Sequence, residues 1–249
     1  MRVICMMQYD SRGKTLITKE NAYPILKAFA KEYKKQNGIH NPVEIIIVGG
    51  GSILLNYGFR QASQDFDILT QSMERVREVA YRIADQYNLP NDWMNADFSH
   101  TSSYSNRLRD VSKYYCSFNN GSVEFRTVKA QYLIAMKMVS AREYRNDVSD
   151  IVGILTYMKK NNEDISMEII DNAINYLYGN SEKIIREEVY DSVKKYVNLS
   201  EEELDNEYKR LSRIENETKQ ALVVVEQKYP GAVNEDSIDN VIKKIKERQ

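Results

Sequence analysis

The sequence predicts an α+β fold, in which a mixed sheet with flanking helices forms the N-terminal part and helices alone form the C-terminal part. Three observations carry this prediction. The β-branched runs that are typical of strands all lie before residue 130. From Lys129 onward, apolar residues recur at helical spacing. The chain also has only 10 Gly and 4 Pro in 249 residues, and few such breakers favour long helices.

The first half begins with an expected helix over residues 18–37, where apolar residues share one face and Gly38 supplies the stop. A β-branched run over residues 43–48 is typical of a buried strand. Gly49-Gly50-Gly51-Ser52 follows at once, and a short apolar helix is expected over 53–57.

The expected elements that follow are a strand over 65–69, a helix from Ser72 to residue 87, an irregular polar segment over 88–112, and strands over 113–118 and 123–128. The turn Asn119-Asn120-Gly121 between the last two strands favours a hairpin.

The C-terminal part is predicted to be helical throughout. Helices are expected over about 129–142, 147–160, 166–178, 182–197, 201–229 and 238–247. Ser200 and Glu203 form a capping box for the fifth of these, whose apolar residues follow a rough heptad. A boundary near Asn161-Asn162 divides the chain into an α/β domain over 1–160 and a helical domain over 161–249. We expect a monomer, or a dimer through the C-terminal helices.

Composition excludes several classes of protein. The balance of 35 basic and 36 acidic residues argues against an overall basic nucleic-acid coat, although a local basic cleft stays open. Two distant cysteines, Cys5 and Cys116, and only two histidines argue against a disulfide framework and against a Cys or multi-His metal site. No window approaches ~18 apolar residues, and charges from Asp10 onward end the N-terminal apolar run too early for a signal peptide. We therefore expect a cytoplasmic protein without membrane contact.

Two carboxylates carry the chemistry that the sequence predicts. Alternate strand residues face the same way, so Asp65 and Asp67 point together while Phe66 points into the opposite layer. Adjacent carboxylates repel each other unless a cation lies between them, and a divalent ion with oxygen ligands is the simplest one. The glycine run lets the backbone approach a ligand and opens a helix N-terminus, where phosphates bind well. Together these features predict a metal next to a triphosphate.

Other interpretations of these motifs remain. A lone Asp-x-Asp is commonly a pair of solvated acids, and a lone Gly-Gly-Gly-Ser is commonly a turn. A dinucleotide-binding fingerprint would need glycine at position 54, where Leu54 stands. A P-loop ending in Gly13-Lys14-Thr15 would need glycine at position 8, where Gln8 stands.

Gly49-Gly50-Gly51-Ser52, followed after twelve residues by Asp65-Phe66-Asp67, resembles the signature of the DNA-polymerase-β-like nucleotidyltransferase superfamily. Arg60 and Ser63 ahead of the acids, and a second block over 137–151, resemble the bacterial AbiEii-toxin-like and uncharacterised branch. Asp92-Trp93-Met94-Asn95 resembles a further short motif of these relatives. The resemblance covers about residues 40–160.

The resemblance implies a nucleotidyltransferase-like sheet and the Mg²⁺-dependent transfer of a nucleoside monophosphate from a nucleoside triphosphate to an acceptor hydroxyl. Asp65 and Asp67 would hold one or two Mg²⁺ ions, with Mn²⁺ as an alternative. Gly49, Gly50, Gly51 and Ser52 would cradle the phosphates.

Three further site residues are expected, each with a plainer alternative. Lys137 would neutralise the triphosphate, or its ammonium would reach solvent along its stem. Asp147 would be a catalytic or clamping acid, although Asp147 and Asp150 also suit a helix start. Glu124 is the candidate third carboxylate, or a surface residue of an edge strand. Asp92 and Asp97 are alternatives to Glu124.

The acceptor is left open by the sequence. The resemblance implies a toxin-like role with a tRNA or other RNA acceptor, modified at its 3′ end in the case of tRNA, and an antitoxin protein as partner. A protein or small-molecule hydroxyl is an alternative acceptor. Four basic residues interleaved with tyrosines suit a nucleic-acid strand, or else a solvated loop; they are Arg107, Arg109, Lys113 and Arg126, with Tyr104, Tyr114 and Tyr115. A catalytically degenerate transferase scaffold that binds protein or RNA is the alternative function.

Overall fold

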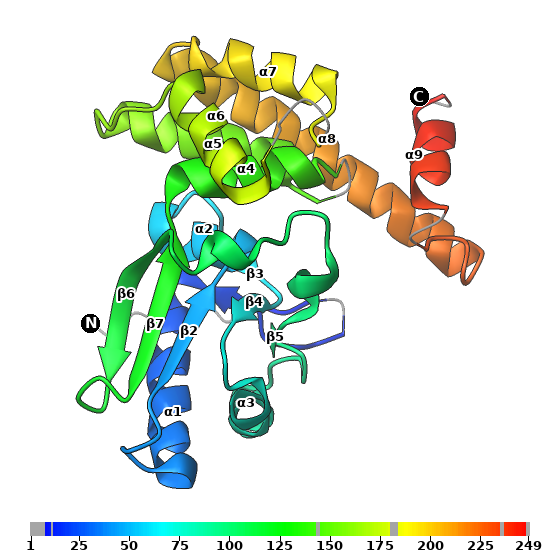
Figure 1. Cartoon of the computed structure of the whole chain (residues 1–249). Helices are drawn as coiled ribbons and strands as arrows, with labels where there is room; N and C mark the ends of the chain where they lie inside the picture. The colour runs from blue at the N-terminus through cyan, green and yellow to red at the C-terminus, as the bar shows by residue number, and fades with distance from the viewer. Residues whose placement is uncertain (1–7, 11, 143–144, 180–183, 235–236, 248–249) are drawn as a thin grey trace, which may run out of the picture.

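The structure, a computed structural model, describes residues 8–10, 12–142, 145–179, 184–234 and 237–247. Its centre is a mixed sheet with strands in the order β5–β4–β2–β7–β6 (Figure 1). Strand β2 is antiparallel to β4 and parallel to β7, while the edge strand β6 is antiparallel to β7 and the edge strand β5 is parallel to β4. The strands are β2 (Val43–Ile47), β4 (Phe66–Leu69), β5 (Met94–Asn95), β6 (Ser112–Phe118) and β7 (Val123–Val128). The predicted α+β fold is confirmed.

The sheet separates two apolar cores, and the side chains of β2 alternate between them. Ile45 and Ile47 pack with helices α1 (Lys19–Asn37) and α3 (Met73–Tyr87), which lie beside each other on one face. Ile46 and Val48, which directly follows β2, pack with α2 (Gly49–Tyr57) and α4 (Ala130–Ser140) on the other face. A strand that is buried on both faces has apolar residues on both sides, which explains the uninterrupted apolar residues over 45–48.

Helix α2 starts earlier than predicted. The short helix expected over 53–57 begins at Gly49, so the glycine run forms the first turn of the helix rather than a turn before it. Close packing explains these glycines, because a Cβ added to Gly51 would lie 2.6 Å from the ring of Phe66. The strand expected over 65–69 begins at Phe66, which leaves Asp65 just ahead of it.

Short elements were missed by the sequence analysis. Strands β1 (Ile17–Thr18) and β3 (Ala62–Ser63) form a separate two-stranded sheet. The segment expected to be irregular contains β5 and two 3₁₀ helices, η1 (Asp97–His100) and η2 (Asn106–Leu108). Elements of two to four residues carry no periodicity that a sequence pattern can show.

Helices form the remainder of the described chain. They are α5 (Asp147–Lys160), α6 (Met167–Tyr178), α7 (Glu187–Val197), α8 (Glu201–Lys228) and α9 (Ile238–Lys246). The predicted capping box is confirmed, because Ser200 and Glu203 exchange the expected hydrogen bonds. The helix expected from residue 182 begins at Glu187, and residues 182 and 183 lie outside the described residues.

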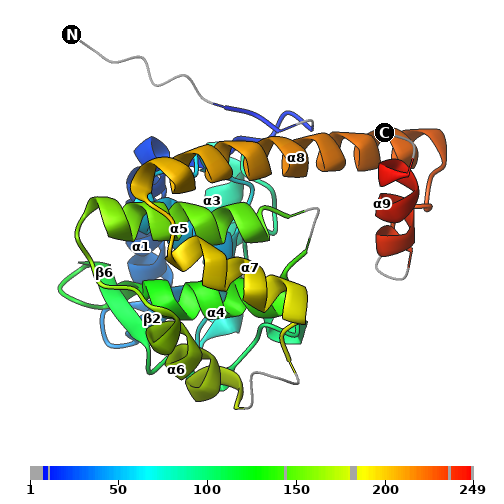
Figure 2. The same ribbon diagram turned by 90° about the horizontal axis from the view of Figure 1, so that it is seen from above.

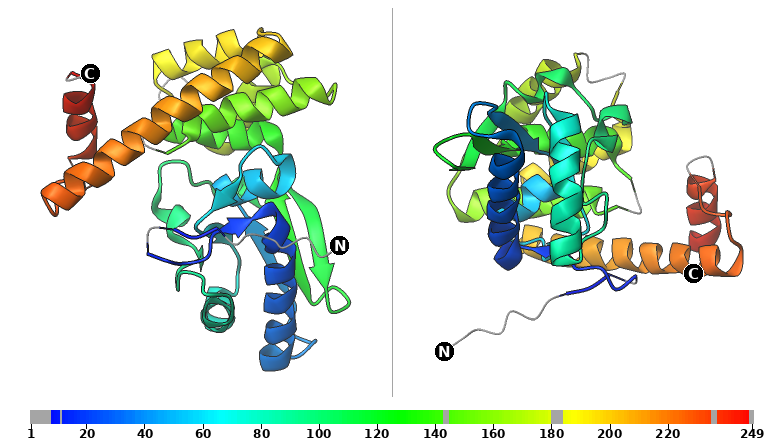
Figure 3. Two further views of the ribbon diagram at one scale, coloured as in Figure 1. Left: turned by 180° about the vertical axis from the view of Figure 1, so that it is seen from behind. Right: turned by 90° about the horizontal axis from the view of Figure 1, so that it is seen from below.

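Helix α8 packs along α5, extends past the rest of the molecule, and meets α9 near its far end (Figures 2 and 3). Val193 of α7 and Leu204 of α8 belong to the same apolar core as α4 and α5. The division of the chain into domains near residue 160 stays a prediction. None of the helices in the described part of the chain combines the length and apolarity that crossing a bilayer requires.

Candidate functional site

The structure places Asp67 beside the first turn of α2, with Asp65 two residues before it in the chain. Phe66 between them is fully buried, whereas both acids are half-buried on the opposite side, as the alternation of a strand requires. The carbonyl of Asp67 accepts a 2.9 Å hydrogen bond from the N–H of Val48. A Cβ added to Gly49 would lie 3.7 Å from Oδ2 of Asp67. Asp67 and the glycine run, separate in the sequence, therefore lie next to each other.

The glycines of this turn have distinct roles. Gly49 has a φ of +54°, in the left-handed region that favours glycine, and this lets α2 begin directly after the extended Val48. The guanidinium of Arg60 lies against Gly50, where an added Cβ would approach its Nη1 to 2.6 Å. Arg60 thus fixes one side of the first turn of α2.

The surroundings of the carboxylate pair raise the pKa of both acids. Burial raises the pKa of Asp67 to about 6, and the negative charge of Asp65 adds to this effect, against the opposing charges of Arg145 and Lys137. Burial also raises the pKa of Asp65; Arg145 opposes this shift, and the charge of Asp92 adds to it. Arg145 is exposed, and its charge opposes the raised pKa of both acids. A cation between the acids would relieve their repulsion.

The donor set at the pair fits Mg²⁺. Mg²⁺ prefers oxygen ligands and is commonly held by one or two carboxylates, with waters and substrate phosphates completing its shell. Asp65 and Asp67 supply such carboxylates and are partly open to solvent. Within the residues that the structure describes, no group of three or more His, Cys, Asp or Glu side chains could hold a metal ion. A metal at this pair would therefore take its other ligands from water and substrate.

A buried network of charges lies behind the pair. Lys137 is 8% exposed, and its Nζ lies 2.6 Å from Oδ1 of Asp147 and 2.9 Å from Oδ2 of Asp150. Arg142 donates from its backbone N–H and from Nε to Oδ2 of Asp147, both at 3.0 Å. Nη1 of Arg60 lies 2.9 Å from Oδ2 of Asp150. Lys137 is thus a paired, buried ammonium, which excludes the alternative that it reaches solvent along its stem.

Ionisation of Asp147 depends on these partners. Burial opposes its charge, but the charges of Lys137 and Arg142 and their hydrogen bonds outweigh burial and lower the pKa of Asp147 to about 2. Asp147 is therefore a carboxylate across the neutral pH range. Its two oxygens are occupied by protein donors, so it acts by holding Lys137 and Arg142.

Ser52 lies beneath the turn rather than on its surface. Its side chain is fully buried, and its Oγ accepts a 2.9 Å hydrogen bond from the N–H of Val128 and one of 3.4 Å from Nδ2 of Asn56. The hydroxyl therefore ties α2 to the end of β7.

The structure keeps Glu124 apart from the other predicted site residues. Glu124 pairs with Nη1 of Arg126 at 2.6 Å and lies opposite Glu44 in the sheet. Asp67 lies at the level of Val48, four residues further along β2, which is ~13 Å at ~3.3 Å per residue. The geometry does not support Glu124 as a third ligand at the pair. Of the other two candidate acids, Asp92 is the one whose charge acts on Asp65.

Sequence reasoning gave no role to Arg60, Arg142 or Arg145, although all three stand inside the motifs that carry the resemblance. Arg60 and Asp150 are 90 residues apart in the chain, and only the fold brings them together. The sequence offered one local sign of their role, since Arg142 and Arg145 both stand within five residues of Asp147.

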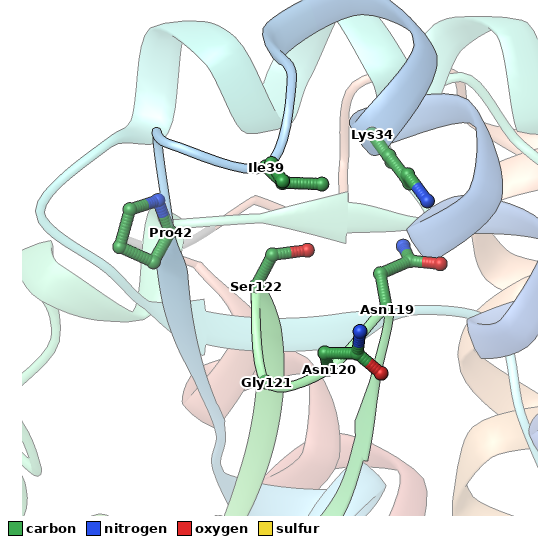
Figure 4. Close-up of a pocket in the computed structure, with 7 residues that line it drawn as sticks. All are labelled: Lys34, Ile39, Pro42, Asn119, Asn120, Gly121 and Ser122. Carbon is green, nitrogen blue, oxygen red and sulfur yellow. The ribbon is translucent and has the colours of Figure 1, made fainter.

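A cavity of about 270 Å³ lies elsewhere, between the β6–β7 hairpin and the C-terminal end of α1 (Figure 4). None of the predicted site residues lines it, and the same is true of a smaller cavity of about 70 Å³ beside Glu44 and Arg109. The carboxylate pair lies outside both of these cavities.

A family described as "Nucleotidyltransferase of unknown function (DUF6036)" matches residues 25–202, more than half of the chain. The matched region contains the glycine turn, the carboxylate pair and the buried charge network. No curated protein and no solved structure is similar enough to this chain to count as a match.

Proposed function

The chain belongs to the DUF6036 family of nucleotidyltransferases, and we propose that it transfers a nucleoside monophosphate from a nucleoside triphosphate to an acceptor hydroxyl, with Mg²⁺ as cofactor. One observation carries the proposal: the carboxylate of Asp67, on which the charge of Asp65 acts, faces a helix N-terminus that begins with Gly49. That arrangement offers a site for a divalent cation next to a site for phosphate.

Each part of the site has a proposed task. Asp65 and Asp67 hold Mg²⁺, which when bound offsets the charge of the phosphates. The backbone of the glycine turn, Gly49 to Gly51, binds a phosphate group through its free N–H groups. Arg145, exposed beside both acids, contacts the same substrate. Preorganised charges of this kind supply most of the rate in phosphoryl-group chemistry.

In the proposed transfer, one bond to the α-phosphorus forms and one breaks. The oxygen of the acceptor hydroxyl forms a bond to the α-phosphorus, the bond from that phosphorus to the bridging oxygen breaks, and pyrophosphate leaves. The proton of the hydroxyl passes to solvent. The chain contributes orientation, because it holds the triphosphate by its charged end and leaves the α-phosphorus facing the acceptor.

Lys137 and Asp147 take part in this proposal through their neighbours. Lys137 is held by two aspartates and contributes its charge to Asp67 from behind, so we propose that it tunes the pair rather than clamping a free phosphate. Ser52 supports the turn from below through Val128. Mn²⁺ in place of Mg²⁺ is compatible with the same oxygen ligands.

The proposal includes a toxin-like role, which the resemblance to the AbiEii branch supports. In this role the acceptor is an RNA, modified at its 3′ end in the case of tRNA, and an antitoxin protein is the partner. The contacts of the basic residues do not favour the region of Arg107 to Arg126 as a strand-binding track. Each of the four contacts a partner within the chain: Arg107 lies over the ring of Tyr176, Arg109 and Arg126 pair with Glu44, and Lys113 lies over the ring of Tyr57.

Calorimetric titration of the full chain with ATP, GTP, CTP and UTP, with and without Mg²⁺, tests the function. We expect Mg²⁺-dependent binding of at least one nucleotide, and transfer of α-³²P label from it to RNA or protein. Asp65→Asn should abolish both, while Asp85→Asn, an exposed acid on α3, serves as the matched control. Undiminished transfer by the Asp65→Asn protein would contradict the assignment. Absence of any nucleotide binding in the wild type would favour the degenerate scaffold.

A further inference from the structure

Helix α8 turns an acid inward and an apolar residue outward. Glu215 is 6% exposed, whereas its neighbour Ile214 is 37% exposed. Glu215 shares the inward side of α8 with the buried Leu204 and Leu222. Burying an acid is costly unless protein groups replace its contacts with water, so this inversion requires a compensating contact.

That contact is with the start of α5. Oε1 of Glu215 accepts a hydrogen bond of 3.2 Å from the backbone N–H of Ser149, while its buried Oε2 finds no hydrogen-bond partner in the described part of the chain. Ser149 is the third residue of α5, and the N-cap residue Asn146 gives this helix no side-chain cap. An N-cap side chain normally accepts the N–H at this very position. Glu215 therefore supplies from α8 the cap that α5 lacks.

Two other acids occupy the same helical turn. Asp147 and Asp150 lie close enough for their charges to raise the pKa of Glu215, in addition to the larger effect of its burial. The two aspartates are compensated by Lys137 and by arginines, whereas Glu215 has no ion-pair partner among the described residues. The hydrogen bond from Ser149 to Glu215 therefore forms in spite of the repulsion between Glu215 and the two aspartates. This is expected of a group that holds the first turn of α5 in place.

We propose that Glu215 is a positioning residue of the candidate site, which caps α5 from α8 and thereby fixes the two aspartates that hold Lys137 and Arg60. This inference rests on the proposed function. Arg60 lies between Asp150 and Gly50, so a shift of the first turn of α5 moves the guanidinium that supports the glycine turn. Glu215 lies beyond residue 202, where the family match ends, so α8 completes the site in this chain.

Four variants of the full chain test the proposal. Glu215→Ala removes the acceptor, Glu215→Asp keeps the charge but withdraws the oxygen by one methylene, and Glu215→Gln keeps the oxygen but removes the charge. Glu217→Ala, an exposed glutamate on the same helix, is the matched control. Two readouts are needed: hydrogen exchange of the Ser149 amide, which does not depend on any nucleotide, and the Kd of the Mg²⁺–nucleotide complex by calorimetry.

We expect Glu215→Ala and Glu215→Asp to exchange the Ser149 amide at least tenfold faster and to weaken nucleotide affinity about tenfold, because α5 loses its cap. Glu215→Gln should keep both properties, since its amide oxygen still accepts the N–H. If Glu215→Ala does not fold, the proposal is tested by comparing the Gln and Asp variants in amide exchange and in nucleotide affinity.

Two results would overturn the proposal by itself. One is normal exchange and normal affinity in the Asp and Ala variants, and the other is a Gln variant as impaired as the Asp variant. A wild type that binds none of the tested nucleotides would instead overturn the proposed function, and the exchange rates would then report on the cap alone.

Discussion

The carboxylate of Asp67 faces the backbone of Gly49 so closely that a side chain at Gly49 would begin 3.7 Å from its Oδ2. The contact joins the start of β4 to the start of α2, the helix that follows β2. It leaves the first amides of α2 beside a pair of acids. A ligand that carries both a cation and an anion suits this junction better than an ion of either sign alone.

Gly49→Ala is expected to weaken nucleotide binding more than it weakens the fold. The left-handed φ of +54° costs a residue with a Cβ about 1–2 kcal/mol. The added methyl also occupies the approach to the amides of α2. Urea unfolding and calorimetry measure the two effects. Gly121→Ala, at φ +83° in open space in the distant hairpin, is the control, with a similar stability loss and unchanged Kd. Equal Kd values for the Gly49 variant and the wild type would argue against phosphate binding at this turn.

Asp67→Asn should stabilise the metal-free protein while it removes metal binding. The raised pKa of Asp67 means that its charge is unfavourable in the folded state at neutral pH. Because the group is half-exposed, the gain is about 1 kcal/mol, or roughly 2–4 °C in Tm. Added Mg²⁺ should raise the Tm of the wild type but not that of the variant. A lower Tm for Asp67→Asn in chelator would show that the pair is held by contacts other than those described.

Gly50→Ala tests the role of Arg60 through a double-mutant cycle. A Cβ at Gly50 would meet Nη1 of Arg60 at 2.6 Å, so the guanidinium must shift, which weakens its ion pair with Asp150. We expect a loss of about 1–2 kcal/mol in the wild-type background, because a buried carboxylate holds one of its partners less well. In the Arg60→Ala background the same glycine substitution should cost under 1 kcal/mol. Additive effects of the two substitutions would contradict the contact.

Local patterns identified the parts of the fold and of the site that depend on neighbouring residues. The β-branched run of β2 and the alternating acids of β4 each follow from a few consecutive positions. The sequence places the glycine run ahead of the helix expected over 53–57, whereas the structure includes the run in that helix. What makes it helical here is tertiary: Phe66 and Arg60 occupy the space that side chains would need.

The remainder of the site depends on residues that are distant in the sequence. Arg60 meets Asp150 across 90 positions, and Glu215 meets Ser149 across 66. Neither contact can be recognised from the spacing or the periodicity of residues in the sequence. Lys137 is the instructive intermediate case, since its charge within an apolar helix predicted either a phosphate ligand or an ammonium that reaches solvent. The structure shows two aspartates instead, which lie 10 and 13 residues further along the chain.

The buried pair of Lys137 and Asp147 should make the protein sensitive to acid in a defined range. The pKa of Asp147 is lowered from 3.8 to about 2, so its stabilising contribution is fully present above about pH 4 and is lost as the pH falls toward 2. Asp147→Asn removes this contribution and leaves Lys137 with Asp150 alone. We expect a loss of about 3 kcal/mol at neutral pH, roughly 6–12 °C in Tm.

The difference in unfolding free energy between wild type and Asp147→Asn, followed by urea titration over acid pH, isolates this contribution from that of the other carboxylates. It should be constant above about pH 4 and shrink steadily below it, because only the wild type has a carboxylate to protonate there. The same difference for the exposed Asp85→Asn should be small and flat. A difference that stays constant down to about pH 2 would mean that Lys137 and Arg142 do not hold Asp147 as an anion, and that the network behind the carboxylate pair is assembled by packing alone.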